Sequence, residues 1–198
     1  AFSDGVFSIA ITLLVLDIHV PPIEQADATG LLTQLLHLWP NLLAFVASFF
    51  FILVMWINHH RVFTLIRRSD NNLLLLNGLL LFGVILLPFP TALVAEYLQH
   101  RDETTAILVY NVWFLVIAIF FNMLWRYASH NNRLFTDNTD RKLAASITRQ
   151  YTLGFPPYIV AIVVGLFSPL LSILITLALG IYFVLPSRSI TKLTDADK

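Results

Sequence analysis

Long apolar runs alternate with short polar segments along the whole chain. Six runs are long enough, at the rise of an α-helix, to be read as membrane spans of about 20 residues. They cover residues 2–20, 39–63, 73–98, 105–127, 151–167 and 169–185. The charge-free residues 165–171 predict a tight hairpin between the last two. The pattern predicts an all-α, polytopic membrane protein with six transmembrane helices in a single domain, residues 1–198.

The first run differs from a plain membrane anchor because its polar residues fall in register. At about 100° per residue, Asp4, Ser8 and Thr12 share one arc of a helix with Val15 and His19. Carboxylates are costly near hydrocarbon unless they face protein or water. We therefore expect one stripe of this helix to pack against other helices and another to face an ion pathway. The second stripe, which is apolar, contains Gly5, Ile9, Leu13, Leu16 and Val20.

The composition supports a membrane protein and narrows its chemistry. The chain is 58% hydrophobic and 12% charged, whereas soluble domains are about 25% charged. It has no cysteine, which excludes disulfides, thiolate catalysis and cysteine metal sites. Its formal net charge of zero gives no support for a nucleic-acid partner. It contains no HExxH, GxSxG or Walker sequence, so we expect neither an enzyme nor a metal or cofactor site.

Basic residues indicate the orientation of the spans. All but one of the 12 Lys and Arg residues fall on one side, Arg101 being the exception. Because Lys and Arg accumulate in cytoplasmic loops, that side and both termini are predicted to be cytoplasmic. The opposite side is acidic, and an outer mouth that includes Asp17 would attract cations over about 8 Å at physiological salt. Ordinary positive-inside bias explains the outer acids equally well.

A polar network is predicted where the first span begins and the second ends. The two spans run in opposite directions, so these ends lie at the same depth, and an indole, an amide and an imidazole can donate hydrogen bonds to a carboxylate there. Such a network would hold the first helix in one orientation. Alternatively, the carboxylate is favoured by the helix dipole and the other side chains belong to the interfacial belt. The predicted members are Ser3, Asp4, Trp56, Asn58 and His59.

Three motifs carry a family resemblance. The sequence FSDGVFSIAITLLVLDI, which occurs once, resembles the signature first helix of the transmembrane protein 175 family of potassium channels. The segments WINHHR and LLPFPTAL resemble the second and third helices of that family, and the two prolines of LLPFPTAL predict a kink. The resemblance implies a homotetramer of single-repeat chains in a lipid bilayer, a prokaryotic plasma (inner) membrane, with the first helices around a central pore.

The same resemblance implies roles for the two stripes. It places stacked apolar constriction rings at Ile9, Leu13 and Leu16, and assigns a potassium preference to Thr12, which lies beside Ser8 on the polar stripe. An apolar constriction can gate by dewetting without a charged plug. Without the family, the apolar stripe would be read as lipid-facing.

We therefore predict a passive, potassium-favouring cation channel with no cofactor other than permeant potassium ions. It lacks a TVGYG-type filter, so the usual carbonyl filter of potassium channels is not expected. The main alternative is a proton-coupled secondary transporter that uses Asp4 and the His59/His60 pair as a relay. A membrane scaffold without transport activity is the third interpretation.

Overall fold

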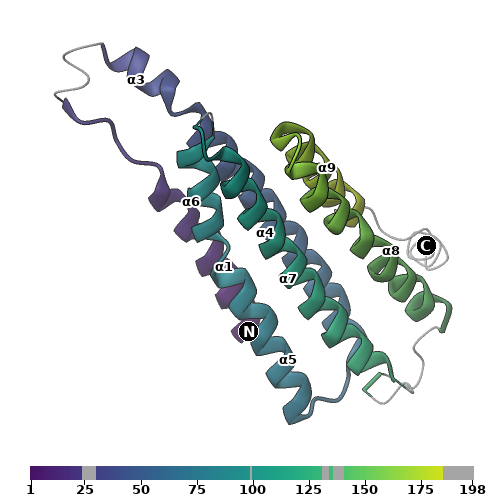
Figure 1. The fold of residues 1–198 in the computed structure, drawn as a ribbon. Helices are drawn as coiled ribbons and strands as arrows, with labels where there is room; N and C mark the ends of the chain where they lie inside the picture. The colour runs from purple at the N-terminus through teal and green to yellow at the C-terminus, as the bar shows by residue number, and fades with distance from the viewer. Residues whose placement is uncertain (24–29, 99, 131–133, 136–140, 185–198) are drawn as a thin grey trace, which may run out of the picture.

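The chain folds into an elongated bundle of helices (Figure 1). The structure is a computed structural model, and it describes residues 1–23, 30–98, 100–130, 134–135 and 141–184. Figure 1 shows α1 along one flank of the bundle and the α8–α9 pair along the opposite flank. The elements are α1 Phe2–Leu13, η1 Leu14–Asp17, α3 Leu31–His37, α4 Trp39–Leu65, α5 Asn71–Ile85, α6 Pro88–Tyr97, α7 Glu103–Ser129, α8 Arg141–Gly165 and α9 Pro169–Val184.

Three segments are long and apolar enough to cross a membrane: α4, the α5–α6 segment and α7. Each is 27 residues long, which corresponds to about 40 Å of helix. Helix α9 is apolar but shorter, with 16 residues. The all-helical class predicted from the sequence is confirmed in the described residues, where the only strand-like pairing is one β-bridge between Ile66 and Phe135.

The first helix is shorter than its apolar run. Helix α1 ends at Leu13, the 3₁₀ turn η1 continues to Asp17, and Ile18 is extended, with φ −90° and ψ 95°. The prediction of a helix over residues 2–20 is therefore wrong at its end. Pro21 and Pro22 explain the difference, because a proline disfavours helical geometry in the residue before it and cannot donate a helical hydrogen bond.

The third apolar run is broken where the prolines predicted a kink. Helix α5 ends at Ile85 and α6 starts at Pro88. Because Pro88 and Pro90 have no N–H, local bonds replace part of the helical ladder. The Phe89 N–H donates to the Leu86 carbonyl at 3.1 Å, and the Thr91 hydroxyl donates to the Leu87 carbonyl at 2.9 Å.

The fifth run differs most from its prediction. Helix α8 starts at Arg141 rather than at residue 151 and continues through Pro156 and Pro157, which were expected to interrupt it. Its polar first turns dock on α7, where the Trp125 indole donates to the Thr148 hydroxyl at 2.9 Å. The predicted hairpin is confirmed, since only residues 166–168 separate α8 from α9. Helix α3 was not predicted.

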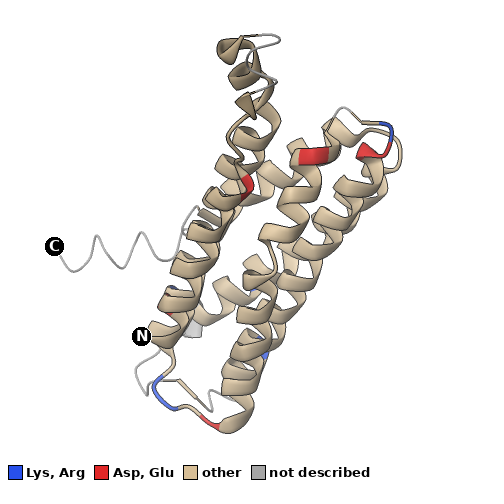
Figure 2. Cartoon of the chain, turned by 90° about the vertical axis from the view of Figure 1, so that its left-hand side faces the viewer, with Lys and Arg blue, Asp and Glu red and all other residues tan. Residues whose placement is uncertain are grey.

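Charged residues gather at the two ends of the bundle (Figure 2). The α4–α5 connection at one end carries Arg67 and Arg68, and the α6–α7 connection at the other carries Arg101 and Asp102. Several charges used to predict the orientation lie outside the described residues. They are Glu24, Asp27, Arg133, Arg188, Lys192 and Lys198.

Candidate functional site

Helix α1 has one packed face and one exposed face. Phe7, Ala10 and Leu14 are at most 1% exposed and belong to the core shared with α4 and α5. By contrast, Ile9 is 54% exposed, Leu13 39% and Leu16 66%. Large apolar side chains are therefore presented outward along the whole length of α1 and η1.

Both predicted stripes lie on the exposed face. The polar residues Asp4, Ser8 and Thr12 are exposed, as are the apolar residues Ile9 and Leu13 beside them. Within one chain, neither stripe is therefore buried against the described helices. A third face packs instead, because it carries the bulky Phe7 next to the small Ala10, which lets α1 approach α4 and α5 closely.

The exposed face repeats its side chains at the spacing of helical turns. Ile9 and Leu13 are one turn apart, about 6 Å along the axis. The Thr12 hydroxyl donates within its own helix, to the Ile9 carbonyl at 2.9 Å and the Ser8 carbonyl at 3.1 Å. Its oxygen lone pairs therefore remain available on the exposed face, and the face offers alternating apolar and oxygen-bearing levels.

The contact predicted between Asp4 and Trp56 is present. The Trp56 indole N–H donates to Asp4 Oδ1 at 2.9 Å, joining α1 to α4. The Asp4 carboxylate is 53% exposed, so it remains in reach of water. This bond provides one tie between the start of α1 and the end of α4.

A second tie passes through Asn77, which was not among the predicted network residues. Its amide donates to Ser3 Oγ at 3.1 Å, and its Oδ1 lies 2.8 Å from His59 Nε2. Asn77 therefore joins α1, α4 and α5. His59 is buried, packed against Phe7 and stacked on Phe63 with ring centroids 4.3 Å apart. The available signal was an asparagine within an apolar run, which by itself indicates an interhelical hydrogen bond but no partner.

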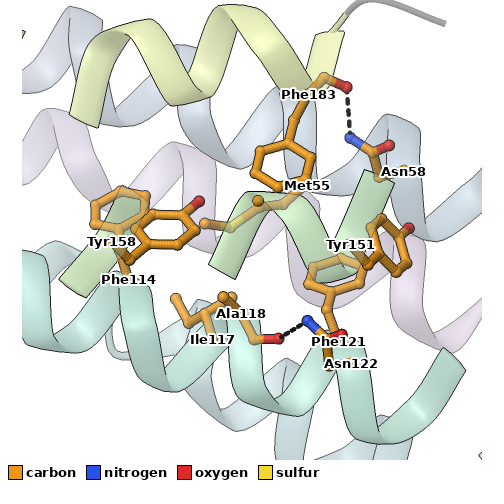
Figure 3. Close-up of a pocket in the computed structure, with 11 residues that line it drawn as sticks. Met55, Asn58, Phe114, Ile117, Ala118, Phe121, Asn122, Tyr151, Tyr158 and Phe183 are labelled. Atoms are coloured by element: carbon orange, nitrogen blue, oxygen red, sulfur yellow. Dashed lines mark hydrogen bonds between the residues drawn. The ribbon is translucent and has the colours of Figure 1, made fainter. Parts of the chain in front are cut away.

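Asn58 is not placed in this network. Its amide donates to the Val54 carbonyl at 2.9 Å and to the Phe183 carbonyl of α9 at 3.0 Å. It lines a cavity of about 50 Å³ enclosed by α4, α7, α8 and α9 (Figure 3). The prediction failed because Asn58 and His59 are adjacent in sequence, so they point to different sides of α4, about 100° apart.

Asp17 ends η1 and borders an open cleft of about 290 Å³ that also touches Asn41 of α4 and Glu96 of α6. Its Oδ2 is shielded from solvent and has no hydrogen-bond partner among the described residues. Within that part of the chain, no group of three or more His, Asp or Glu side chains is arranged to hold a metal ion.

Comparison with known proteins relates the whole chain to channels. Residues 1–88 match the family described as endosomal/lysosomal potassium channel TMEM175. A potassium channel of Chamaesiphon minutus is 50% identical over 96% of this chain and 93% of its own length. The human endosomal/lysosomal proton channel TMEM175 is 33% identical over 65% of this chain and 27% of its own.

A solved structure is similar over nearly the same extent. It is the crystal structure of a lysosomal potassium-selective channel TMEM175 homolog from Chamaesiphon minutus. The fold agrees with a TM-score of 0.86 at 49% sequence identity, over 94% of this chain and 95% of that one.

Proposed function

This chain belongs to the TMEM175 family of potassium channels, and from that premise we propose that it conducts K⁺ in preference to Na⁺ through a pore walled by α1. The observation that carries the proposal is the exposed face of α1. Among the described residues of one chain, no helix covers Ile9, Leu13 and Leu16, although these side chains lie within an apolar run. Four copies around an axis would place these residues opposite one another.

In this proposal all six apolar runs cross the bilayer. The α1–η1 segment and α9 comprise 16 residues each, about 24 Å of helix, and α8 uses its apolar second half. These segments are shorter than a hydrophobic layer of about 30 Å, so we expect the bilayer to be thinner beside them. The end that holds the α4–α5 connection faces the cytoplasm, as do both termini, because Lys and Arg dominate there. Asp17 and the acidic opposite end form the outer mouth and raise the local concentration of cations.

The proposed barrier is a set of apolar rings separated by a level of hydroxyls. Rings of Ile9, Leu13 and Leu16 exclude water when narrow, which stops ions without a charged gate. Between them, Thr12 presents oxygen lone pairs that can replace part of the hydration shell of K⁺, and Ser8 presents a second hydroxyl one turn earlier. Ions would pass without any covalent chemistry or cofactor.

Proton transport has to be considered as well, because the human relative is named a proton channel. The transporter alternative requires a relay from Asp4 to the histidines. In the structure, Asp4 is bonded to Trp56 and His59 is bonded to Asn77, so the two groups belong to separate hydrogen-bonded pairs. This arrangement favours an anchoring role for both over a direct proton relay.

The experiment is a bi-ionic recording from purified protein in a planar bilayer, with K⁺ on one side, Na⁺ on the other and equal pH. The proposal predicts unitary current steps and a reversal potential displaced toward the potassium equilibrium potential. A flux that saturates at low turnover and requires a proton gradient would replace the channel with the transporter. Absence of any flux from folded, tetrameric protein would support the scaffold.

A further inference from the structure

A groove runs along the outside of the bundle between α7 and α8. It has a volume of about 470 Å³ and is open along its length. Its walls are mainly apolar, with a basic residue at one end. The α7 side contributes Ile119, Asn122, Met123 and Arg126, and the α8 side contributes Thr152, Phe155 and Pro156.

Arg126 lies in the last turn of α7, and its charge is not neutralised by the rest of the described chain. Its side chain is exposed, and the described residues include no carboxylate within ion-pair distance of it. Its guanidinium Nη2 donates to Thr152 Oγ1 at 3.3 Å, a long bond to a neutral acceptor. The Thr152 hydroxyl already donates to the Thr148 carbonyl at 2.8 Å. Most of the guanidinium donors are therefore left for an anionic ligand.

Pro156 adds an acceptor beside this cation. It lies within α8 and has no N–H, so the Thr152 carbonyl, four residues earlier, receives no helical hydrogen bond from it. A carbonyl that lacks this bond can accept a hydrogen bond from water, protein or lipid. The basic end of the groove therefore offers a guanidinium donor from α7 and, beside it, a carbonyl acceptor from α8.

The groove lies far from the proposed pore. Figure 1 shows α8 on the flank opposite α1, so a central axis lined by α1 would leave the α7–α8 groove at the periphery, facing lipid. From Arg126 to Ile119 the groove rises seven residues along α7, about 10 Å toward the centre of the bilayer. A charged end at the membrane surface and an apolar length beneath it match the shape of a phospholipid.

We propose that this groove binds one phospholipid with an anionic headgroup, such as phosphatidylglycerol, in the leaflet on the Arg-rich side. The phosphate accepts hydrogen bonds from Arg126, a glycerol hydroxyl donates to the Thr152 carbonyl, and one acyl chain lies against Ile119, Met123 and Phe155. Charge complementarity selects the headgroup, because basic pockets between transmembrane helices at this depth favour anionic lipids.

The test is native mass spectrometry of the purified full-length chain, titrated with phosphatidylglycerol or phosphatidylcholine of identical acyl chains. We expect the anionic lipid to bind on the order of tenfold more tightly. Both lipids carry the phosphate, but phosphatidylcholine places a second cation, its choline, beside Arg126 and has no hydroxyl that could donate to the Thr152 carbonyl. Arg126→Gln should reduce this preference to about twofold or less. Arg101→Gln, which removes an arginine from the opposite end of the bundle, is the matched control and should retain the full preference.

A second variant tests the acyl part of the site without changing charge. Ile119→Trp fills the groove and should weaken the binding of both lipids while leaving Arg126 in place. Three results would overturn the proposal: full preference in Arg126→Gln, an equal loss in Arg101→Gln, or unchanged binding in Ile119→Trp. The first two would indicate unspecific attraction, and the third a headgroup held at the surface only.

Discussion

At the scale of single residues, the orientation of α1 depends on two polar ties near its start. Asn77 connects Ser3 to His59, and Trp56 holds Asp4. Because both ties act on the first turn, they fix the rotation of α1 about its axis. A rotation of one residue, about 100°, would exchange the packed and the exposed faces. The two ties therefore decide which side chains of α1 are exposed on the surface of the chain.

Replacing Asn77 by leucine should destabilise the protein. The change keeps the number of side-chain heavy atoms but removes both bonds, which leaves the buried His59 without its Asn77 partner at a cost of about 1–3 kcal/mol. Thermal unfolding in detergent is the measurement. Asn122→Leu is the matched control, because among the described residues the Asn122 amide donates to the Ala118 carbonyl of its own helix and to no other helix. An equal loss in both variants would refute a special role for Asn77.

The apolar rings give a second prediction at this scale. Leu13→Asn should raise the resting leak severalfold, because an amide at a narrow constriction favours water in the pore. Leu170→Asn, a highly exposed leucine of α9 on the flank opposite α1, should leave the leak unchanged. Both are measured as ion flux from proteoliposomes. Equal leaks in Leu13→Asn and the parent protein would remove Leu13 from the pore.

The Thr12 hydroxyl gives a third prediction at the scale of single residues. Thr12→Val keeps the shape and removes the oxygen, so the K⁺/Na⁺ permeability ratio should fall about fivefold if the oxygen contributes about 1 kcal/mol of selectivity. Thr12→Ser retains a hydroxyl and should preserve most of the ratio. Bi-ionic reversal potentials measure both variants. If valine and serine give the ratio of the parent chain, Thr12 has no part in the selection.

At the scale of elements, the apolar runs predict where helices lie better than where they end. The runs at 39–63 and 105–127 correspond to α4 and α7 within a few residues. The start of α8 at Arg141 was not predicted, because its first turns are polar and are positioned by a tertiary contact between Trp125 and Thr148. Helix α3 was not predicted either, because its seven residues are too few to show a helical periodicity. Hydrogen-bond partners such as Asn77 depend on how the helices pack, and the lengths of the apolar runs do not predict that packing.

The contact between α4 and α9 depends on a glycine, which yields an element-scale prediction. A Cβ at Gly180 would lie 2.5 Å from Cε1 of Phe51, whose ring packs edge-on against Phe114. Gly180→Ala should therefore destabilise the protein by about 1–3 kcal/mol through overpacking. Thermal unfolding measures the loss.

A double-mutant cycle supplies the control. Phe51→Leu removes the ring atoms that would clash, so adding Gly180→Ala to Phe51→Leu should cost much less than Gly180→Ala alone. Purely additive effects would show that the glycine is needed for another reason.

At the scale of the whole molecule, a single chain leaves one face of α1 exposed. Periodicity alone found two stripes on α1 and led us to expect one of them to face other helices, whereas within one chain neither stripe is buried against the described helices. In the proposed assembly, α1 has three environments: the core of its own chain, the neighbouring copies and the pore. A single sequence gives no direct measure of the second and third. Assigning the stripes therefore depends on the assembly.

The central claim, that the exposed face of α1 lines the pore, is tested most directly by cysteine accessibility, because the chain has no cysteine of its own. The measurement is the K⁺ current of Leu16→Cys in a bilayer before and after a cationic methanethiosulfonate reagent, with Phe167→Cys in the exposed α8–α9 turn as the labelled control. The account predicts that the reagent blocks Leu16→Cys and spares Phe167→Cys. Full current through Leu16→Cys, with labelling of that cysteine demonstrated, would contradict it.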